Sequence, residues 1–363
     1  MKNRKKKVAI IGTNGIPARY GGFETLTQYI SKELGKDFDF TIYCSSIYKK
    51  KERRKKYNNT NLIYFPFKAN GIQSVLYDII STFHAWFTAD VLLILGPAAG
   101  FILPLNFIFK KTIITNHGGL NEWEREKLSF IQKKYAYINH KIAALYSNFN
   151  ITDNLPLKKS LFQSFGVESE VIEYGGDHIN IENICSKSLK KYPFLSKPYS
   201  LCVARAQKDN NLHLLIDAFK DLPDKNLVII SNWNISHYGQ DIWEKTKLHN
   251  VFLLQAVYDK NELDIIRSNT DLYIHSHSQC GTAPSLVEAM SYNIPVICYD
   301  VETNRETTEH KSFYYSNSKD LKLLVSNLSV EKRLELKEKM FIIAKNKYTW
   351  KNISGKYQKL IKL

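Results

Sequence analysis

The sequence lacks any apolar stretch long enough to cross a lipid bilayer. Its longest apolar runs, around Val91–Leu95 and Phe101–Phe109, are far shorter than the roughly 20 residues that a membrane-spanning helix needs. The first residues, Met1–Lys7, are basic and carry none of the apolar run of a secretory signal peptide. We therefore expect a cytoplasmic protein.

Cysteine is also scarce. The five cysteines are scattered through the 363 residues, with none of the paired spacings of zinc sites or disulfide frameworks. We expect all of them to be reduced thiols, and they are Cys44, Cys185, Cys202, Cys280 and Cys298.

Acidic residues are too few to balance the basic ones. The chain has 51 Lys and Arg against 35 Asp and Glu, a formal charge of +16, and the excess is concentrated in Lys2–Lys7 and Lys49–Lys56. The basic residues of the second run repel one another unless a partner neutralises them. On charge alone, nucleic acid, an anionic membrane and a phosphorylated substrate are all suitable partners. The residues assigned to this contact are Lys49, Lys50, Lys51, Arg53, Arg54, Lys55 and Lys56.

The length predicts two domains. A chain of 363 residues exceeds the size at which a single core usually stops growing. The pattern of strands and helices breaks near Tyr192–Pro198, where two prolines flank a short connector. We place an N-terminal domain at residues 1–190 and a second domain at residues 199–345.

Both halves have the pattern of an α/β fold. Short apolar runs end at glycine-rich or polar corners and alternate with segments whose apolar residues recur at helical spacing. This alternation predicts two Rossmann-like domains with parallel sheets, whose strand ends face a shared central cleft. The predicted strands are Val8–Gly12, Val91–Leu95, Thr112–Thr115, Val171–Tyr174, Tyr199–Arg205, Leu227–Ile230, Val251–Leu254, Leu272–His275 and Pro295–Cys298.

The first candidate ligand-binding loop is Gly12–Glu24, which has four glycines and leads into a predicted helix. At the helix amino terminus, Gly21 and Gly22 allow a ligand to approach the backbone and present N–H groups to an anion, so we assign both glycines to donor binding. The spacing differs from the Gly-x-Gly-x-x-Gly fingerprint of dinucleotide-binding proteins. This difference disfavours a nicotinamide-dependent oxidoreductase.

The second loop begins with Arg205 at the end of a predicted strand and continues through Lys208 and Asn210. A guanidinium in this position offers a planar fork of donors that fits a diphosphate. We therefore assign Arg205 a catalytic role at the diphosphate, and Lys208 and Asn210 to donor binding. The alternative is a surface arginine paired with a carboxylate.

The third loop, Cys280–Ala283, leads into a predicted helix at Pro284–Ser291. Proline is favoured at a first helical position, where its missing N–H costs nothing. Glu288 lies one turn into the helix on the side of the loop, where its carboxylate can accept both hydroxyls of a ribose. The residues whose amides and hydroxyls can hold phosphate oxygens are Gly281, Thr282, Ala283 and Ser285. Together these features predict a nucleoside-diphosphate site.

Several motifs resemble those of a known enzyme family. They are GIPARYGGFET at Gly15–Thr25, GLNEWEREK at Gly119–Lys127, YGGD at Tyr174–Asp177 and GTAPSLVEAM at Gly281–Met290. Over nearly the whole chain, the sequence resembles the retaining glycosyltransferases of family 4, which have the GT-B fold, and within them the rhamnosyltransferase-like enzymes of bacterial surface-polysaccharide synthesis. The family's Glu-x7-Glu motif has Cys280 in place of its first glutamate, and Asn210 stands where the family often has lysine.

The resemblance implies a reaction. A sugar, with L-rhamnose as the candidate, moves with retention of configuration from a nucleoside-diphosphate donor to a glycan or polyprenyl-diphosphate-linked acceptor. Arg205 stabilises the departing diphosphate, and His117 hydrogen-bonds a hydroxyl of the sugar. The last helix, within residues 346–363, packs back on the first domain.

His275 and His277 lie two residues apart at a strand end, with no third metal ligand visible in the sequence. We assign His277 to the wall of the donor pocket. We expect neither a metal nor a cofactor, because protein groups supply the positive charge at the diphosphate. The acidic residues Glu122, Glu124 and Glu126 face either the acceptor or solvent.

Two other functions remain open. A sugar-nucleotide epimerase on the same fold is the nearest alternative, and the charge together with 13% aromatic residues suggests a nucleic-acid-binding protein. The basic runs lie outside the predicted cleft, so we expect no nucleic-acid partner. We instead expect Lys49–Lys56 to hold the enzyme peripherally at the anionic inner face of the plasma membrane. The nearby apolar stretch Ile72–Phe87 is interpreted as a buried core helix, with a membrane-facing amphipathic helix as the alternative.

Overall fold

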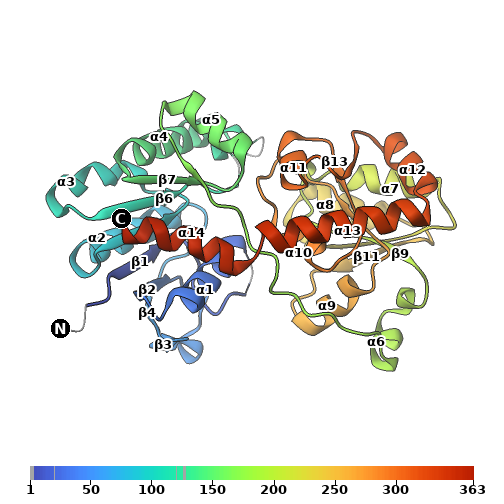
Figure 1. Ribbon diagram of the computed structural model, residues 1–363, viewed down its shortest axis with the longest axis horizontal. Coiled ribbons are helices and arrows are strands. Elements are labelled where there is room, and N and C mark those ends of the chain that lie inside the picture. Colours follow the sequence, from blue (N-terminus) through green and yellow to red (C-terminus); the bar gives the residue numbers. More distant parts are fainter. Residues whose placement is uncertain (1–3, 20, 120, 126–127) are drawn as a thin grey trace. The chain divides into compact units, whose positions relative to one another are not determined.

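The computed structural model describes residues 4–19, 21–119, 121–125 and 128–363 (Figure 1). The chain forms two compact units, one from Met1–Glu173 with Trp350–Leu363 and the other from Tyr174–Thr349. Each unit has its own parallel sheet covered by helices. The predicted pair of Rossmann-like α/β domains is therefore confirmed.

The first unit is built on an eight-stranded sheet with the order β3-β4-β2-β1-β5-β6-β7-β8. Neighbouring strands are parallel except for the β3–β4 pair. The central strand β5 is buried along its whole length, as expected for a parallel strand with helices on both faces. The strands are β1 (Lys7–Ile11), β2 (Asp39–Cys44), β3 (Lys56–Tyr57), β4 (Thr60–Tyr64), β5 (Val91–Leu95), β6 (Thr112–Asn116), β7 (Phe149–Thr152) and β8 (Glu170–Val171).

Helices cover both faces of this sheet. From β1 to β2 the chain moves along the sheet towards β3, whereas from β4 to β5 and from β6 to β7 it moves towards β8. Because such connections are right-handed, α1 lies on one face and α2, η2, α3 and α4 lie on the other. The helices are α1 (Gly22–Leu34), α2 (Gln73–Thr88), α3 (Asn106–Phe109), α4 (Phe130–Tyr146), α5 (Leu155–Phe165) and α14 (Trp350–Lys362), with short 3₁₀ turns η1 (Lys50–Glu52), η2 (Gly100–Leu105) and η3 (Glu122–Glu124).

The C-terminal helix α14 packs on α1 within the first unit. Tyr29 of α1 stacks on Trp350 with ring centroids 4.7 Å apart. Asn116 Nδ2, at the end of β6, donates to the buried Tyr357 hydroxyl at 2.7 Å. Lys356 pairs with Glu173. These contacts hold the last helix on the sheet that begins the chain.

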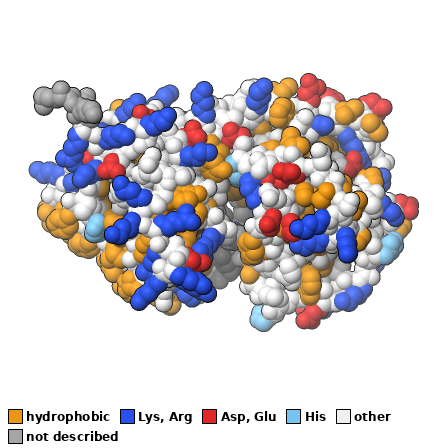
Figure 2. All heavy atoms as spheres, turned by 90° about the horizontal axis from the view of Figure 1, so that it is seen from below, with side chains coloured by type: hydrophobic (Ala, Val, Ile, Leu, Met, Phe, Trp, Pro, Cys, Tyr) orange, Lys and Arg blue, Asp and Glu red, His pale blue; other side chains and the backbone are white. Residues whose placement is uncertain are grey.

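The segment Ile72–Phe87 was interpreted as a buried core helix, but one side of the helix that it forms, α2, is exposed. Its inner side buries residues such as Tyr77, Ala85 and Trp86. Its outer side exposes a stripe at spacings of three and four residues, formed by Ile72, Leu76, Ile80, Phe83 and Phe87. Apolar residues occupy more of the helix circumference than one packed layer can cover, so hydrophobic side chains remain on the surface (Figure 2). Among the described residues, no helix combines the length and apolarity needed to cross a membrane.

The second unit is built on a six-stranded, fully parallel sheet with the order β11-β10-β9-β12-β13-β14. Its strands are β9 (Tyr199–Val203), β10 (Asn226–Ser231), β11 (Val251–Gln255), β12 (Leu272–His275), β13 (Val296–Tyr299) and β14 (Phe313–Tyr315). Its helices are α6 (Ser186–Lys191), α7 (Leu212–Lys220), α8 (His237–Lys245), α9 (Lys260–Ser268), α10 (Pro284–Ser291), α11 (Glu302–Thr307), α12 (Ser318–Asn327) and α13 (Val330–Lys347), with 3₁₀ turns η4 (Pro193–Ser196), η5 (Lys208–Asn210) and η6 (Trp233–Ile235).

The second unit begins earlier than the predicted domain junction, because residues 174–198 pack on it. Gly176 N donates to Tyr348 O at 2.7 Å, and Glu182 N donates to Ser268 Oγ at 3.0 Å. A Cβ at position 176 would lie 2.5 Å from Val287 O, so only glycine permits this close approach. The first unit therefore ends at Glu173 rather than at residue 190.

We predict that Tyr357→Phe destabilises the first unit. The substitution leaves the buried Asn116 amide without its acceptor, which costs about 1–3 kcal/mol of unfolding free energy. Urea denaturation measures this loss. Tyr146→Phe, on an exposed tyrosine of α4, is the matched control and is expected to leave stability unchanged. Equal stabilities of the two variants would contradict the role of this hydrogen bond.

Candidate functional site

The strand order of the second sheet reverses beside β9. From β9 the chain moves outward through β10 to β11, and then returns to the other side of β9 at β12. The loops after β9 and β12, residues 204–211 and 276–283, leave the sheet at this topological switch point. Open α/β sheets bind ligands there, outside the carboxyl ends of the strands.

Hydrogen bonds join these two loops. Asn211 Nδ2 donates to Ser276 O at 3.2 Å. Ser278 donates to Asp209 O through both its backbone N, at 2.9 Å, and its Oγ, at 2.8 Å. Asn211 has φ 50°, a left-handed conformation that asparagine tolerates better than most residues. The structure thus brings the predicted segment around Arg205 beside the predicted small-residue loop.

The three predicted residues of the loop after β9 have different environments. Arg205 and Lys208 are exposed, and neither forms an ion pair with any described residue. Asn210 is buried, and its Nδ2 donates to Arg205 O at 2.7 Å. Asn210 therefore fixes the backbone of the loop from inside. The positive charge of the loop comes from Arg205 and Lys208.

Two histidines at the end of β12 form a neutral stack beside this charge. The rings of His275 and His277 lie with centroids 4.5 Å apart and planes 16° from parallel. Burial, followed by the nearby charge of Arg205, lowers the pKa of His277 to about 3. Burial also lowers the pKa of His275 far below its ordinary value. Among the described residues, no three His, Cys, Asp or Glu side chains are grouped to hold a metal ion.

Asn304 of α11 anchors the loop after β12. Its Nδ2 donates to His277 O at 3.0 Å and to Tyr299 O at 2.9 Å. Its Oδ1 accepts from the Cys280 thiol at 3.3 Å. The sulfur of Cys280 therefore points towards this amide. Cys280 occupies the position of the first glutamate in the family's Glu-x7-Glu motif. No spacing pattern in the sequence points to Asn304, because a single asparagine near a helix start is common.

Glu288 is the buried acid of α10. Its Oε2 lies 2.7 Å from Arg267 Nη1, and its Oε1 lies 3.1 Å from His178 Nε2. Burial raises the pKa of Glu288, but the charge of Arg267 and the hydrogen bond with His178 outweigh it and lower the pKa to about 2. A carboxylate has about four lone-pair sites, so its oxygens retain capacity for ribose hydroxyls. Sequence reasoning missed both partners, which lie far from Glu288 along the chain.

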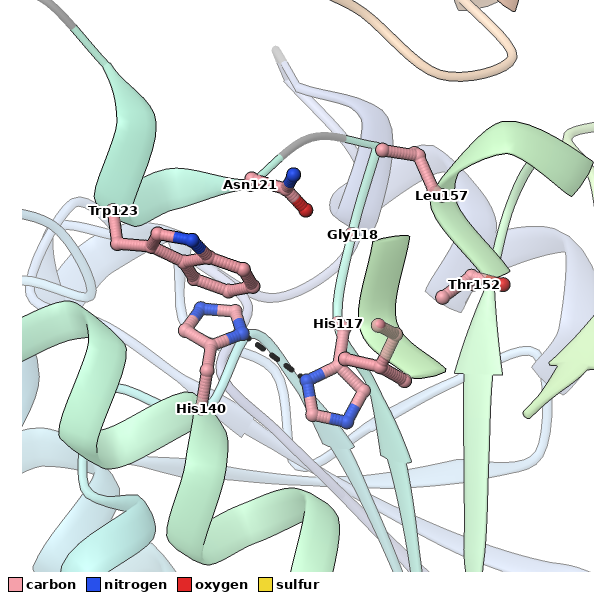
Figure 3. Close-up of a pocket in the computed structure, with 8 residues that line it drawn as sticks. His117, Gly118, Asn121, Trp123, His140, Thr152 and Leu157 are labelled. Atoms are coloured by element: carbon pink, nitrogen blue, oxygen red, sulfur yellow. Dashed lines mark hydrogen bonds between the residues drawn. The ribbon is translucent and has the colours of Figure 1, made fainter. Parts of the chain in front are cut away.

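His117 lies in the first unit, directly after β6 (Figure 3). Its Nε2 is 2.9 Å from Asn150 Oδ1, and its Nδ1 is 3.1 Å from His140 Nδ1. An amide oxygen only accepts, so Nε2 carries the proton and Nδ1 accepts from His140. Burial lowers the pKa of His117 to about 4. The cavity that it lines with Trp123 measures about 10 Å³, close to the lower limit for one water molecule.

Gly21 and Gly22 also belong to the first unit, at the start of α1. Gly21 has φ 121°, and a Cβ there would lie 2.0 Å from Glu24 Oε2. The buried Glu24 carboxylate accepts from Asn14 N at 2.8 Å and from Asn14 Nδ2 at 3.0 Å. Glu24 therefore closes the glycine-rich loop from inside, and Gly21 is required by the resulting backbone conformation.

The remaining predicted residues of the first unit are exposed. The basic run Lys49–Lys56 surrounds η1 and reaches β3 at the edge of the sheet. Within it, Glu52 pairs with Arg19 at 3.0 Å, and Arg53 Nε donates to Tyr48 O at 3.1 Å. Glu124 is exposed in η3, whereas Glu126 lies outside the described residues.

Two family models match the chain. Residues 187–348, within the second unit, match the family described as glycosyl transferases group 1. This segment of the chain therefore resembles the group 1 glycosyltransferase family. Both switch-point loops and Glu288 lie within the matched segment. Residues 5–177 match a domain of unknown function, DUF1972.

A curated relative resembles part of this chain. The O-antigen chain mannosyltransferase RfbU of Salmonella typhimurium is 26% identical over 192 residues. The match covers 51% of this chain and 52% of RfbU, so the chain spans about half the length of this relative.

Similar solved structures cover nearly the whole chain. Sucrose-phosphate synthase from Thermosynechococcus elongatus has a TM-score of 0.81 and 13% identity, covering 99% of this chain and 98% of that one. HepE from Anabaena, in complex with UDP-glucose, has a TM-score of 0.75 and 16% identity, covering 99% and 100%. These likenesses identify the fold as that of GT-B glycosyltransferases.

We predict that Glu288→Gln destabilises the second unit as well as altering the site. The substitution leaves the buried Arg267 guanidinium without its carboxylate, and removing one partner of a buried ion pair costs about 3–5 kcal/mol. Urea denaturation measures the loss. The double variant Glu288→Gln with Arg267→Met is the control, and it is expected to recover part of the loss because no buried charge is left unpaired.

The same ion pair predicts an acid dependence. Because the folded-state pKa of Glu288 is depressed from 4.5 to about 2, the pair stabilises the fold above pH 4.5 and loses this effect as the pH falls towards 2. The difference in unfolding free energy between wild type and Glu288→Gln should therefore shrink over this range. A difference that stays constant with pH would contradict the assignment.

Proposed function

We propose that this chain transfers a sugar from a nucleoside-diphosphate donor to a glycan acceptor in cell-surface polysaccharide synthesis. The proposal rests on the loops after β9 and β12, which are joined by hydrogen bonds within the segment that matches group 1 glycosyltransferases. Arg205 and Lys208 are exposed in the first of these loops, and the second leads into α10. The structures of HepE with UDP and with UDP-glucose, and the O-antigen role in the name of RfbU, support this class of reaction.

Each donor contact is proposed from the charge and hydrogen-bonding capacity of the side chain. The Arg205 guanidinium binds the diphosphate, Lys208 adds a second positive charge, and Glu288 accepts the ribose hydroxyls. The backbone N–H groups at the start of α10 receive phosphate oxygens. His277 forms a neutral wall of the pocket. The residues proposed for the α10 phosphate contact are Gly281, Thr282, Ala283 and Ser285.

The proposed reaction retains configuration and needs no metal ion. The bond between the anomeric carbon and the diphosphate oxygen breaks as the acceptor hydroxyl oxygen bonds to the same carbon on the same face. The acceptor's proton moves to the departing diphosphate. Negative charge develops on that diphosphate, where fixed donors stabilise the transition state most effectively.

The first unit is proposed to serve the acceptor and the sugar. Gly21 and Gly22 lie at a helix amino terminus, and His117 is the candidate for a sugar hydroxyl. For His117 this role requires that the ring exchange its hydrogen bond to His140 for one to the sugar. A polyprenyl-diphosphate-linked glycan is the proposed acceptor, and the basic run Lys49–Lys56 is proposed to attract the protein to an anionic membrane.

A sugar-nucleotide epimerase remains a second candidate because the fold does not exclude it. A structure described as a UDP-N-acetylglucosamine 2-epimerase from Listeria monocytogenes has a TM-score of 0.63 and 12% identity, covering 99% of this chain. An epimerase would convert the donor without any acceptor. A transferase would consume donor in proportion to the glycan formed.

The test of the proposed function is a donor screen followed by a transfer assay. A donor that binds the folded state raises the melting temperature by mass action. We propose dTDP-L-rhamnose as the first donor, because of the family resemblance, and GDP-mannose as the second, because RfbU is a mannosyltransferase. Transfer to a lipid-linked glycan supports the proposal, whereas epimerised donor without transfer supports the alternative.

We predict that Arg205→Ala lowers turnover at saturating donor by about a hundredfold, because a fixed donor to the departing diphosphate is lost. Affinity for the nucleoside alone should change little. Arg205→Lys is expected to restore only part of the rate, since it lacks the planar fork. Lys220→Ala, at an exposed lysine ending α7, is the control. Near-normal turnover of Arg205→Ala would move the leaving-group role to Lys208.

A further inference from the structure

The helices on one side of the first sheet present an apolar outer surface. We call this surface the apolar helical face. It comprises Ile72, Leu76, Ile80, Phe83 and Phe87 of α2 and its N-cap, Phe101 and Leu105 of η2, Phe107 and Ile108 of α3, and Phe130, Ile131, Tyr135, Ile138 and Leu145 of α4. Every one of these side chains is exposed. Contiguous apolar surfaces of this kind mark interaction sites.

The helices that form the face are joined to one another. Phe87 of α2 packs edge-on against Phe109 of α3, with ring centroids 5.2 Å apart. The Tyr135 hydroxyl of α4 donates to Ala98 O at 2.8 Å, just before η2, and Phe101 N donates to Asn139 Oδ1 at 3.1 Å. The exposed residues therefore belong to one packed layer rather than to separate surface helices.

The helices that form the face expose lysines and no acidic side chain, although the exposed Glu124 lies in η3, which packs on α4. No acidic residue occurs between Asp90 and Glu122, and none occurs in α4. The one acidic residue of α2, Asp78, is buried on the inner side. The lysines in and beside these helices are Lys68, Lys110, Lys111, Lys133, Lys134 and Lys141.

We propose that the apolar helical face lies in the headgroup region of an anionic lipid bilayer. Apolar and aromatic side chains enter the boundary between headgroups and acyl chains, while lysines at the rim reach anionic headgroups. This surface combines apolar area with positive charge, whereas the run Lys49–Lys56 offers charge alone. The inference rests on the proposed function for its biological purpose, access to a lipid-linked acceptor, but binding to lipid does not depend on that function.

The lysines of these helices favour lipid over a second copy of this chain. A two-fold symmetric dimer would place the same surface patch against itself, and so would bring the lysines of both copies together. Repulsion between like charges opposes that arrangement. Anionic headgroups neutralise the same lysines.

The test measures co-sedimentation of the full chain with vesicles, without any sugar nucleotide. The vesicles are either pure phosphatidylcholine or a mixture with phosphatidylglycerol. The test variant replaces Ile72, Phe107, Phe130 and Ile131 by serine; these side chains are 72–91% exposed, so the substitutions remove little packing. The matched control replaces four exposed apolar residues of the second unit, Leu323, Val330, Leu334 and Ile342, by serine.

We expect wild type and the control to bind the anionic vesicles, and the test variant to bind at least tenfold more weakly at an unchanged melting temperature. If the test variant is destabilised, Phe107→Ser alone is used, with at least a threefold loss of binding expected.

Equal binding of wild type and test variant would overturn the proposal, as would a wild-type dimer that the variant abolishes in the absence of lipid. A variant with Lys49–Lys56 neutralised by glutamine should bind more weakly without being released, because the run contributes charge but not apolar contact, and its complete release would reassign the contact to the basic run. Because the readout is sedimentation, failure of the proposed transfer reaction would not alter it.

Discussion

The buried ion pair between Glu288 and Arg267 is the interaction on which the candidate site of the second unit depends. It ties α10 to α9, and His178 ties the segment after Gly176 to the same carboxylate. An unpaired charge in this place would be costly, so the three segments are held together as a group. The start of α10, which is proposed to receive the phosphates, is thereby fixed relative to the sheet before any ligand arrives.

Local sequence patterns were sufficient to predict the elements that carry the site. The apolar run at Leu272–His275 and the proline-led segment at Pro284–Ser291 form β12 and α10 with the predicted bounds. These patterns are local because an apolar run between polar corners, or a proline at a helix start, needs no distant partner to be recognised. The positions of Arg205 and Lys208 after β9 follow from the same reasoning.

Partners that are distant in sequence could not be predicted. The chain separates Glu288 from His178 by more than a hundred residues, and only the fold brings them together. Asn304 and Asn211 likewise carry no motif, although they hold the loops after β12 and β9 in place. The burial of α2 was wrongly predicted because the composition indicates an apolar helix but does not indicate how many of its sides pack against other elements.

The loops after β9 and β12 are proposed to form a nucleoside-diphosphate site. Hydrogen–deuterium exchange of the full chain with and without saturating UDP, GDP, dTDP or CDP tests this directly, because bound phosphates and ribose shield the backbone amides that they contact. We expect at least one of these nucleotides to slow exchange in residues 204–211 and 276–288. Protection confined to residues of the first unit, or no protection with any of the four, would contradict it.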